Sequence, residues 1–280
     1  MPPIPLTIAQ TLAHAQHLGL ERLDAQMLLL HALQRATHER AWLLAHDSDP
    51  IDANSAERLH ALVLRRLAGE PLAYLTGFKE FYGLPLAVDA RVLDPRPDTE
   101  TLVDWTLALL DAPTLPLRLI DLGTGSGAIA LALKHSRPKW QVSAVDLQAD
   151  ALAVARANAQ RLGLDVPFTQ GSWLAGVQGT FHAIVSNPPY IPADDPHLAA
   201  LTHEPFNALA SGADGLDDIR QILAQAPAHL EPGGWLLLEH GYDQADAVRT
   251  LLTAAGLTQV QSRCDLAGIE RCSGGQKPGC

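Results

Sequence analysis

The chain has 280 residues, of which 47% are hydrophobic and 18% are charged, and its formal net charge is -11 at pH 7. This composition predicts a globular protein with a large hydrophobic core and room for two domains. The negative charge argues against a broad phosphate-binding surface, because duplex binding normally needs clustered Lys and Arg side chains. We therefore expect no nucleic-acid partner.

The cysteines and the N-terminal segment indicate the compartment. Cys264, Cys272 and Cys280 form an odd set without metal-ligand spacing, which is typical of a reducing environment. The N-terminal segment lacks a charged region followed by an apolar core, and no window approaches about eighteen uninterrupted apolar residues. His14 and His17 have helical spacing but no accompanying cysteine or carboxylate cluster. We expect a cytoplasmic protein with no membrane segment and no metal.

The N-terminal part of the chain shows helical periodicity only. From residue 6 to about 70, apolar side chains recur every three or four residues in three groups: Ile8, Leu12 and Ala15; Leu23, Met27 and Leu30; Leu59, Val63 and Leu67. Thr7 and Gln10 have the spacing of a capping box, and Gly19 and Gly69 are expected helix stops. The pattern predicts a small helical domain over residues 1–72.

The rest of the chain alternates between strand and helix patterns. Around Gly77 and Gly83 the period shortens, which predicts a β-hairpin linker over residues 73–90. The domain that follows, 91–280, contains alternating segments at 117–122, 128–136, 140–146, 150–162, 166–169, 181–186, 214–229, 234–240, 243–255 and 257–264. Such alternation predicts an α/β fold with a parallel sheet covered on both faces.

A glycine-rich loop follows the first of these strands. Asp121 to Gly127 reads Asp-Leu-Gly-Thr-Gly-Ser-Gly and leads into an Ala- and Leu-rich helix. Glycines after a strand let the backbone approach a ligand closely, and the helix N-terminus offers free N–H groups. The next strand ends at Asp146, where a carboxylate could accept both hydroxyls of a ribose. Similar loops also serve dehydrogenases or are purely structural.

A proline turn, Asn187-Pro188-Pro189-Tyr190, follows the apolar run from Phe181 to Val185. The prolines fix φ and donate no backbone hydrogen bonds, so the carbonyls of the turn stay free to face a ligand. The Asn187 side-chain oxygen adds an acceptor, and Tyr190 can cover a flat face. The turn therefore predicts a site for a planar amide or amino nitrogen that carries two hydrogens.

These three features fall on one edge of one predicted sheet, where ligands bind in folds of this kind. The combination resembles the S-adenosylmethionine-dependent methyltransferases, and the proline turn resembles those that methylate amino or amide nitrogens. The whole chain resembles the release factor glutamine methyltransferase family. The resemblance rests on these segments: 77–83, 92–100, 121–127, 187–190, 203–205, 208–209, 215–217 and 265–268. Asp94 departs from it, because the family usually has an apolar residue before Pro-Arg-Pro.

The resemblance implies a Rossmann-like class I methyltransferase sheet with a small N-terminal helical domain. It also implies methyl transfer from S-adenosylmethionine to the amide nitrogen of the glutamine in the Gly-Gly-Gln motif of peptide chain release factors. The implied catalytic residues are Asn187, Pro188 and Tyr190, which bind the substrate together with Pro189. The implied cofactor-binding residues are Gly123, Thr124, Gly125, Ser126, Gly127, Asp146, Trp173 and Asn187. We expect a monomer.

Several of these assignments have alternatives. Trp173 can lie beside the adenine or in the core, and Glu204 and Asn207 can line the pocket or lie on a solvated loop.

A methyltransferase acting on an exocyclic amino group of a nucleic-acid base would need a similar site. A binding module without catalysis is a third possibility.

Two further segments have simpler interpretations. The segment with Arg96, Thr99 and Glu100 reads as a helix start, with Thr99 or Asp98 as its cap. Gly274-Gly275-Gln276 repeats the expected substrate triplet, and we interpret it as a coincidence in a flexible terminus.

Overall fold

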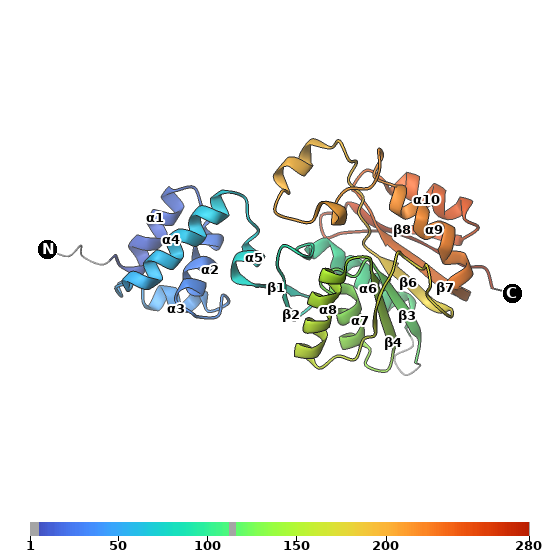
Figure 1. The fold of residues 1–280 in the computed structure, drawn as a ribbon, viewed down its shortest axis with the longest axis horizontal. Helices are drawn as coiled ribbons and strands as arrows, with labels where there is room; N and C mark the ends of the chain where they lie inside the picture. Colours follow the sequence, from blue (N-terminus) through green and yellow to red (C-terminus); the bar gives the residue numbers. More distant parts are fainter. Residues whose placement is uncertain (1–5, 112–115, 280) are drawn as a thin grey trace. The chain divides into compact units, whose positions relative to one another are not determined.

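The computed structural model describes residues 6–111 and 116–279. Two compact units divide between Gly77 and Phe78 (Figure 1). Within the described ranges, no helix is long and apolar enough to cross a membrane.

The first unit is built from helices packed around leucines. Leu28, Leu29 and Leu30 are fully buried, and Leu59 and Val63 pack into the same cluster. Two of the periodic residues, Leu23 and Leu67, are instead 47% and 45% exposed. The helices of this unit are α1 (Ile8–His17), α2 (Arg22–Ala32), α3 (Arg40–Ala45), α4 (Ala53–Leu67) and α5 (Leu72–Thr76).

The predicted capping box at the start of α1 is confirmed. The Gln10 backbone N–H donates to the Thr7 hydroxyl at 3.3 Å, and the Thr7 backbone N–H donates to the Gln10 side-chain oxygen at 3.0 Å. Gly19 and Gly69 both have positive φ and lie just after α1 and α4, as expected for helix stops.

The second unit opens with a β-hairpin, whereas residues 73–76 of the predicted linker belong to α5 of the first unit. Strands β1 (Phe78–Phe81) and β2 (Leu84–Ala87) pair antiparallel. Asp94, the residue that departs from the family pattern, is buried and lies 3.4 Å from the ammonium of Lys79 on β1. The unusual carboxylate is therefore accommodated by an ion pair with the hairpin.

The predicted cap of the next helix is wrong. A 3-10 turn (Pro97–Thr99) leads into α6 (Glu100–Leu109), and neither element has a side-chain hydrogen bond at its N-cap. The Thr99 hydroxyl instead accepts a hydrogen bond from Asn187, and the Glu100 carboxylate accepts one from the Tyr82 backbone N–H. Thr99 and Glu100, which the local pattern assigned to the helix start, therefore make hydrogen bonds with residues that are distant in sequence.

A seven-stranded mixed sheet forms the centre of the second unit. Its first five strands are parallel, and β9 runs antiparallel to both of its neighbours. In spatial order the strands are β5 (Phe168–Gln170), β4 (Gln141–Asp146), β3 (Arg118–Leu122), β6 (Phe181–Ser186), β7 (Leu230–Glu239), β9 (Glu270–Gln276) and β8 (Thr258–Cys264).

Helices cover both faces of this sheet. Figure 1 shows α6, α7 (Ala128–Ser136) and α8 (Ala149–Leu162) together on one side, and α9 (Asp217–His229) and α10 (Ala245–Ala254) on the other. The apolar side chains of α9 and α10 pack on those of β3, β6 and β7. This arrangement confirms the expected α/β architecture and brings the carboxyl ends of β3, β4, β6 and β7 to one edge.

Strand β9 corrects the prediction of a flexible terminus. Gly274 is buried in the sheet, where an added Cβ would lie 2.5 Å from the Leu237 side chain. The Gln276 side-chain nitrogen donates to the Gly233 carbonyl at 2.8 Å. Gln276 pairs with Trp235, several residues before the end of β7 that reaches the site. The triplet is therefore part of the sheet and its amide is already engaged.

Candidate active site

The glycine loop is folded against the end of β4. The backbone N–H groups of Gly123 and Thr124 both donate to the Val145 carbonyl, at 2.9 and 3.0 Å. Gly123 has a φ of +69° and Gly127, which begins α7, has a φ of +87°. These left-handed conformations favour glycine and turn the chain sharply from strand to helix.

Asp121 fixes the glycine loop through hydrogen bonds of its carboxylate. Its carboxylate accepts the Thr124 hydroxyl at 2.6 Å and the Ala130 backbone N–H at 3.2 Å. Burial raises the pKa of this carboxyl to about 7, and the nearby Asp146 adds to the rise. Thr124 is thus engaged in shaping the loop, and the Ser126 carbonyl likewise accepts from Asn158 on α8 at 2.9 Å.

Asp146 is fixed by two backbone groups. Its two carboxylate oxygens accept from the N–H of Gly125 at 2.9 Å and from the N–H of Gln148 at 2.8 Å. Burial raises the pKa of the Asp146 carboxyl. A carboxylate can accept about four hydrogen bonds, so Asp146 keeps acceptor capacity for a ligand beside these backbone groups.

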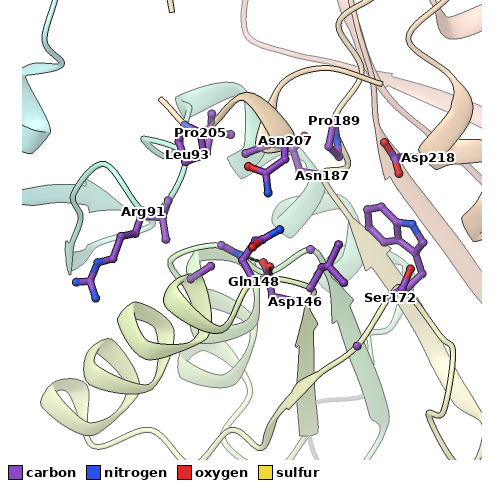
Figure 2. A pocket seen from close by; sticks show the side chains of 18 of the residues that line it. Arg91, Leu93, Asp146, Gln148, Ser172, Asn187, Pro189, Pro205, Asn207 and Asp218 are labelled. Atoms are coloured by element: carbon purple, nitrogen blue, oxygen red, sulfur yellow. Dashed lines mark hydrogen bonds between the residues drawn. The ribbon is translucent and has the colours of Figure 1, made fainter. Parts of the chain in front are cut away.

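A cavity of about 320 Å³ lies beside the glycine loop and is called the larger cavity. Figure 2 shows Asp146 and Gln148 on one side and Asn187, Pro189 and Asn207 across from them. The sequence-predicted residues on its wall are Gly123, Gly125, Asp146, Trp173, Asn187 and Pro189, joined by Asn207. Thr124, Ser126 and Gly127 are not on this wall.

Trp173 borders the larger cavity and also packs against the core. Its ring lies against Gly123, where an added Cβ would be 3.3 Å from a ring carbon, and it borders the larger cavity. The same side chain is partly buried against the apolar cluster under α9. Its backbone φ is +53°, which is uncommon for a residue other than glycine.

The proline turn presents acceptors, as expected, with one exception. The Pro188 carbonyl accepts no hydrogen bond from the part of the chain that the structure describes. The Tyr190 carbonyl, in contrast, accepts from the Gln244 side chain at 3.0 Å and is not free. The Asn187 side-chain nitrogen donates to the Thr99 hydroxyl at 3.2 Å, which leaves its oxygen available.

A second cavity of about 150 Å³ also borders Asn187 and is called the smaller cavity. Tyr190 and Arg96 border it, and Leu93, Asn187 and Ala208 are common to both cavities. Burial raises the pKa of the Tyr190 hydroxyl, so this group stays protonated near neutral pH. The smaller cavity is lined by Leu93, Arg96, Asn187, Tyr190, Ile191, Leu201, Ala208 and Leu209.

Sequence reasoning did not find how these walls are supported. Glu204, predicted to line the pocket or lie on a solvated loop, does neither. It is buried and accepts from Arg96 at 2.5 Å and from the Asp94 backbone N–H at 3.2 Å. Asn158 bridges the hairpin and the glycine loop by exchanging hydrogen bonds with Ala87. No local spacing signals such contacts, because the partners are far apart in sequence.

Comparison with known proteins identifies the family. The Methyltransferase small domain model matches residues 103–245, and the PrmC N-terminal domain model matches residues 7–77. The release factor glutamine methyltransferase of Bordetella pertussis is 51% identical over 92% of this chain and 95% of that protein. The chain belongs to the release factor glutamine methyltransferase family.

Other comparisons agree with this assignment. The release factor glutamine methyltransferase of Burkholderia pseudomallei is 48% identical over 99% of this chain and 98% of that protein. A solved methyltransferase structure from Pyrococcus furiosus has a TM-score of 0.54 and 20% identity, and it covers 78% of this chain and 98% of its own. That likeness concerns the fold alone. The chain is therefore a member of the release factor glutamine methyltransferases with the class I methyltransferase fold.

Proposed function

We propose that this protein transfers the methyl group of S-adenosylmethionine to the side-chain amide nitrogen of the glutamine in the Gly-Gly-Gln motif of peptide chain release factors. The main support is that Asn187 borders both cavities. A methyl donor in the larger cavity and a carboxamide in the smaller one would meet at this residue. The names of the curated relatives support the same substrate.

The larger cavity fits S-adenosylmethionine by the chemistry of its wall. The Asp146 carboxylate borders the cavity and keeps acceptor capacity, which suits a ribose hydroxyl. Trp173 offers a flat aromatic surface to an adenine, and Gly123 allows close backbone approach because it has no Cβ. When bound, the cofactor supplies a methyl group on a positively charged sulfur.

The proline turn holds the substrate amide in this proposal. The Asn187 side-chain oxygen and the Pro188 carbonyl accept the two amide hydrogens, while Pro189 and Tyr190 pack beside the carboxamide. An amide nitrogen is a poor nucleophile because its lone pair is shared with the carbonyl. Neither acceptor is basic enough to take a proton, so their contribution is positioning and stabilisation of the charge that develops on nitrogen. The proton that the methylated nitrogen then loses passes to solvent water. Positioning of this kind supplies on the order of 7–11 kcal/mol in favourable cases.

A labelled-methyl assay tests the proposal. Purified protein is incubated with labelled S-adenosylmethionine and, in parallel, with a release factor, with its variant in which the motif glutamine is alanine, and with nucleic acid. We expect label in the intact release factor only. Label in nucleic acid alone would favour the base-methylating alternative. Cofactor binding without any label would favour the non-catalytic alternative.

A further inference from the structure

Glu239 is a buried acid that neither cavity exposes. It ends β7, at the sheet edge where β6 leads into the proline turn, and its side chain is 1% accessible. One of its carboxylate oxygens has no hydrogen-bond partner among the described residues. A buried carboxylate with an unpaired oxygen is costly, so its presence beside the site needs a physical reason.

Two polar side chains connect Glu239 to the turn. Thr99 and Asn187 lie near its carboxylate and, as hydrogen-bonding neighbours, oppose the rise of its pKa. The Asn187 nitrogen also donates to the Thr99 hydroxyl at 3.2 Å. A carboxylate only accepts, so this triad uses the nitrogen end of the Asn187 carboxamide. The oxygen end has no partner within residues 6–111 and 116–279.

We propose that Glu239 is a positioning residue that holds the Asn187 carboxamide with its oxygen, and not its nitrogen, toward the substrate amide. This inference rests on the proposed function, in which that oxygen accepts an amide hydrogen. A turned Asn187 side chain would present two donors to the two hydrogens of the substrate amide. The resulting donor-to-donor contact would prevent the aligned approach of the substrate nitrogen.

The protonation state of Glu239 decides whether it can hold the Asn187 carboxamide in this orientation. As a carboxylate it accepts from Asn187, whereas a protonated Glu239 can donate to the Asn187 oxygen and stabilise the turned orientation. The charged and titratable groups that face it are Asp98, Arg271, Tyr190 and Cys272. Burial raises the pKa of the Glu239 carboxyl to about 7, and the nearby Asp98 adds to the rise. Methyl transfer should therefore increase as the pH rises through this range.

The sharpest test compares Glu239→Gln with a control on the same strand. Glu231→Gln changes a glutamate near the beginning of β7 that pairs with Arg118 and Thr180, away from the site. Release-factor methylation is measured from pH 6 to pH 9, together with melting temperature and the Kd of S-adenosylhomocysteine. At pH 8 we expect Glu239→Gln to lower kcat by about ten- to a hundredfold with a Kd within about twofold of wild type. Glu231→Gln should keep the wild-type kcat.

The pH profile separates positioning from a merely structural role. Wild type should show a rise in kcat with a midpoint near pH 7, Glu239→Asp should keep a rise, and Glu239→Gln should lose it. The side-chain ¹⁵N signal of Asn187 in the ligand-free protein should titrate in the same range in wild type only. This NMR readout does not depend on enzyme activity.

Three results would overturn the inference. They are a folded Glu239→Gln variant with wild-type kcat at pH 8, an unchanged pH profile in that variant, and a wild-type profile with no ionisation between about pH 6 and 8. If Glu239→Gln does not fold, the wild-type profile and the Asn187 signal still decide. Absence of release-factor methylation by wild type would contradict the proposed function and is distinguishable from all three.

Discussion

The side-chain nitrogen of Asn187 donates to the hydroxyl of Thr99, which lies 88 residues earlier in the chain, across 3.2 Å. This contact joins the residue just before α6 to the proline turn after β6. Both side chains also lie near the carboxylate of Glu239 at the end of β7 and oppose the rise of its pKa. Three separate segments thus fix one carboxamide, and a carboxamide held in one orientation is suited to align a weak nucleophile.

Removing the Thr99 hydroxyl should slow catalysis without disturbing the cofactor. We expect Thr99→Val, which keeps the side-chain shape, to reduce kcat about tenfold because Asn187 loses one of the partners that orient it. The matched control is Thr106→Val on α6, a residue that is also buried and whose hydroxyl donates to the Leu102 carbonyl. Steady-state kinetics with a release factor, beside the Kd of S-adenosylhomocysteine, measure the difference. Equal kcat values for the two variants would contradict this role of Thr99.

Removing the Asn187 side chain should have a larger effect. Asn187→Ala loses an acceptor for the substrate amide, and we expect kcat to fall by about 10²- to 10³-fold, as when one preorganised hydrogen-bonding group is deleted from an active site. Asn207→Ala, which changes another amide on the wall of the larger cavity, should reduce kcat far less. Single-turnover methylation gives both rates. A decrease in kcat of less than about threefold in Asn187→Ala would show that this side chain does not take part in the mechanism.

Gly123 offers a test of the cofactor site. An added Cβ there would lie 3.3 Å from Trp173, on the wall of the larger cavity. Gly163→Ala is the matched control, because Gly163 has nearly the same φ (+66° against +69°) but nothing within 4 Å of the added carbon. Both variants should lose about 1–2 kcal/mol of stability from left-handed backbone strain. Only Gly123→Ala should weaken S-adenosylhomocysteine binding, by about tenfold or more in calorimetry.

The raised pKa of the Asp121 carboxyl should make the free energy of unfolding depend on pH. Its pKa in the folded protein is about 7, raised by burial from a value near 4 in the unfolded chain. The folded state therefore holds this proton more tightly. Its stabilising contribution is fully present below about pH 4 and is lost as the pH rises to about 7. Asp121→Asn should flatten this part of the curve of unfolding free energy against pH, measured by urea denaturation. An identical slope in the variant would contradict the assignment.

Local patterns predicted most elements of the second unit. The helix at 128–136 and the strand at 181–186 have the predicted bounds, because glycines or a proline turn end each apolar run. The strand Glu270–Gln276 was missed because Gly274 and Gly275 give no alternation of apolar side chains. They are buried because Leu237, Trp105 and Leu257 occupy the space that a Cβ would need.

Only those parts of the candidate site that belong to a sequence motif could be predicted. The glycine loop, Asp146 and the proline turn follow from residue types at strand ends, and the fold brings Gly123, Gly125, Asp146, Asn187 and Pro189 to one cavity. The supporting contacts were not predictable. Thr99 resembles a helix cap, and Glu239 ends an apolar strand, so neither has a local signal. The hydrogen bond between Asn187 and Thr99, and the placement of Glu239 near both, depend on the sheet order, which the sequence pattern does not specify.

The orientation of the substrate amide is the centre of this account, and a crystal structure can observe it directly. The protein would be crystallised with S-adenosylhomocysteine and a release factor that contains the Gly-Gly-Gln motif. We predict that the glutamine amide nitrogen lies within about 3.2 Å of both the Asn187 side-chain oxygen and the Pro188 carbonyl. A glutamine bound with its nitrogen away from these two oxygens, or outside the cavity that Tyr190 borders, would contradict it.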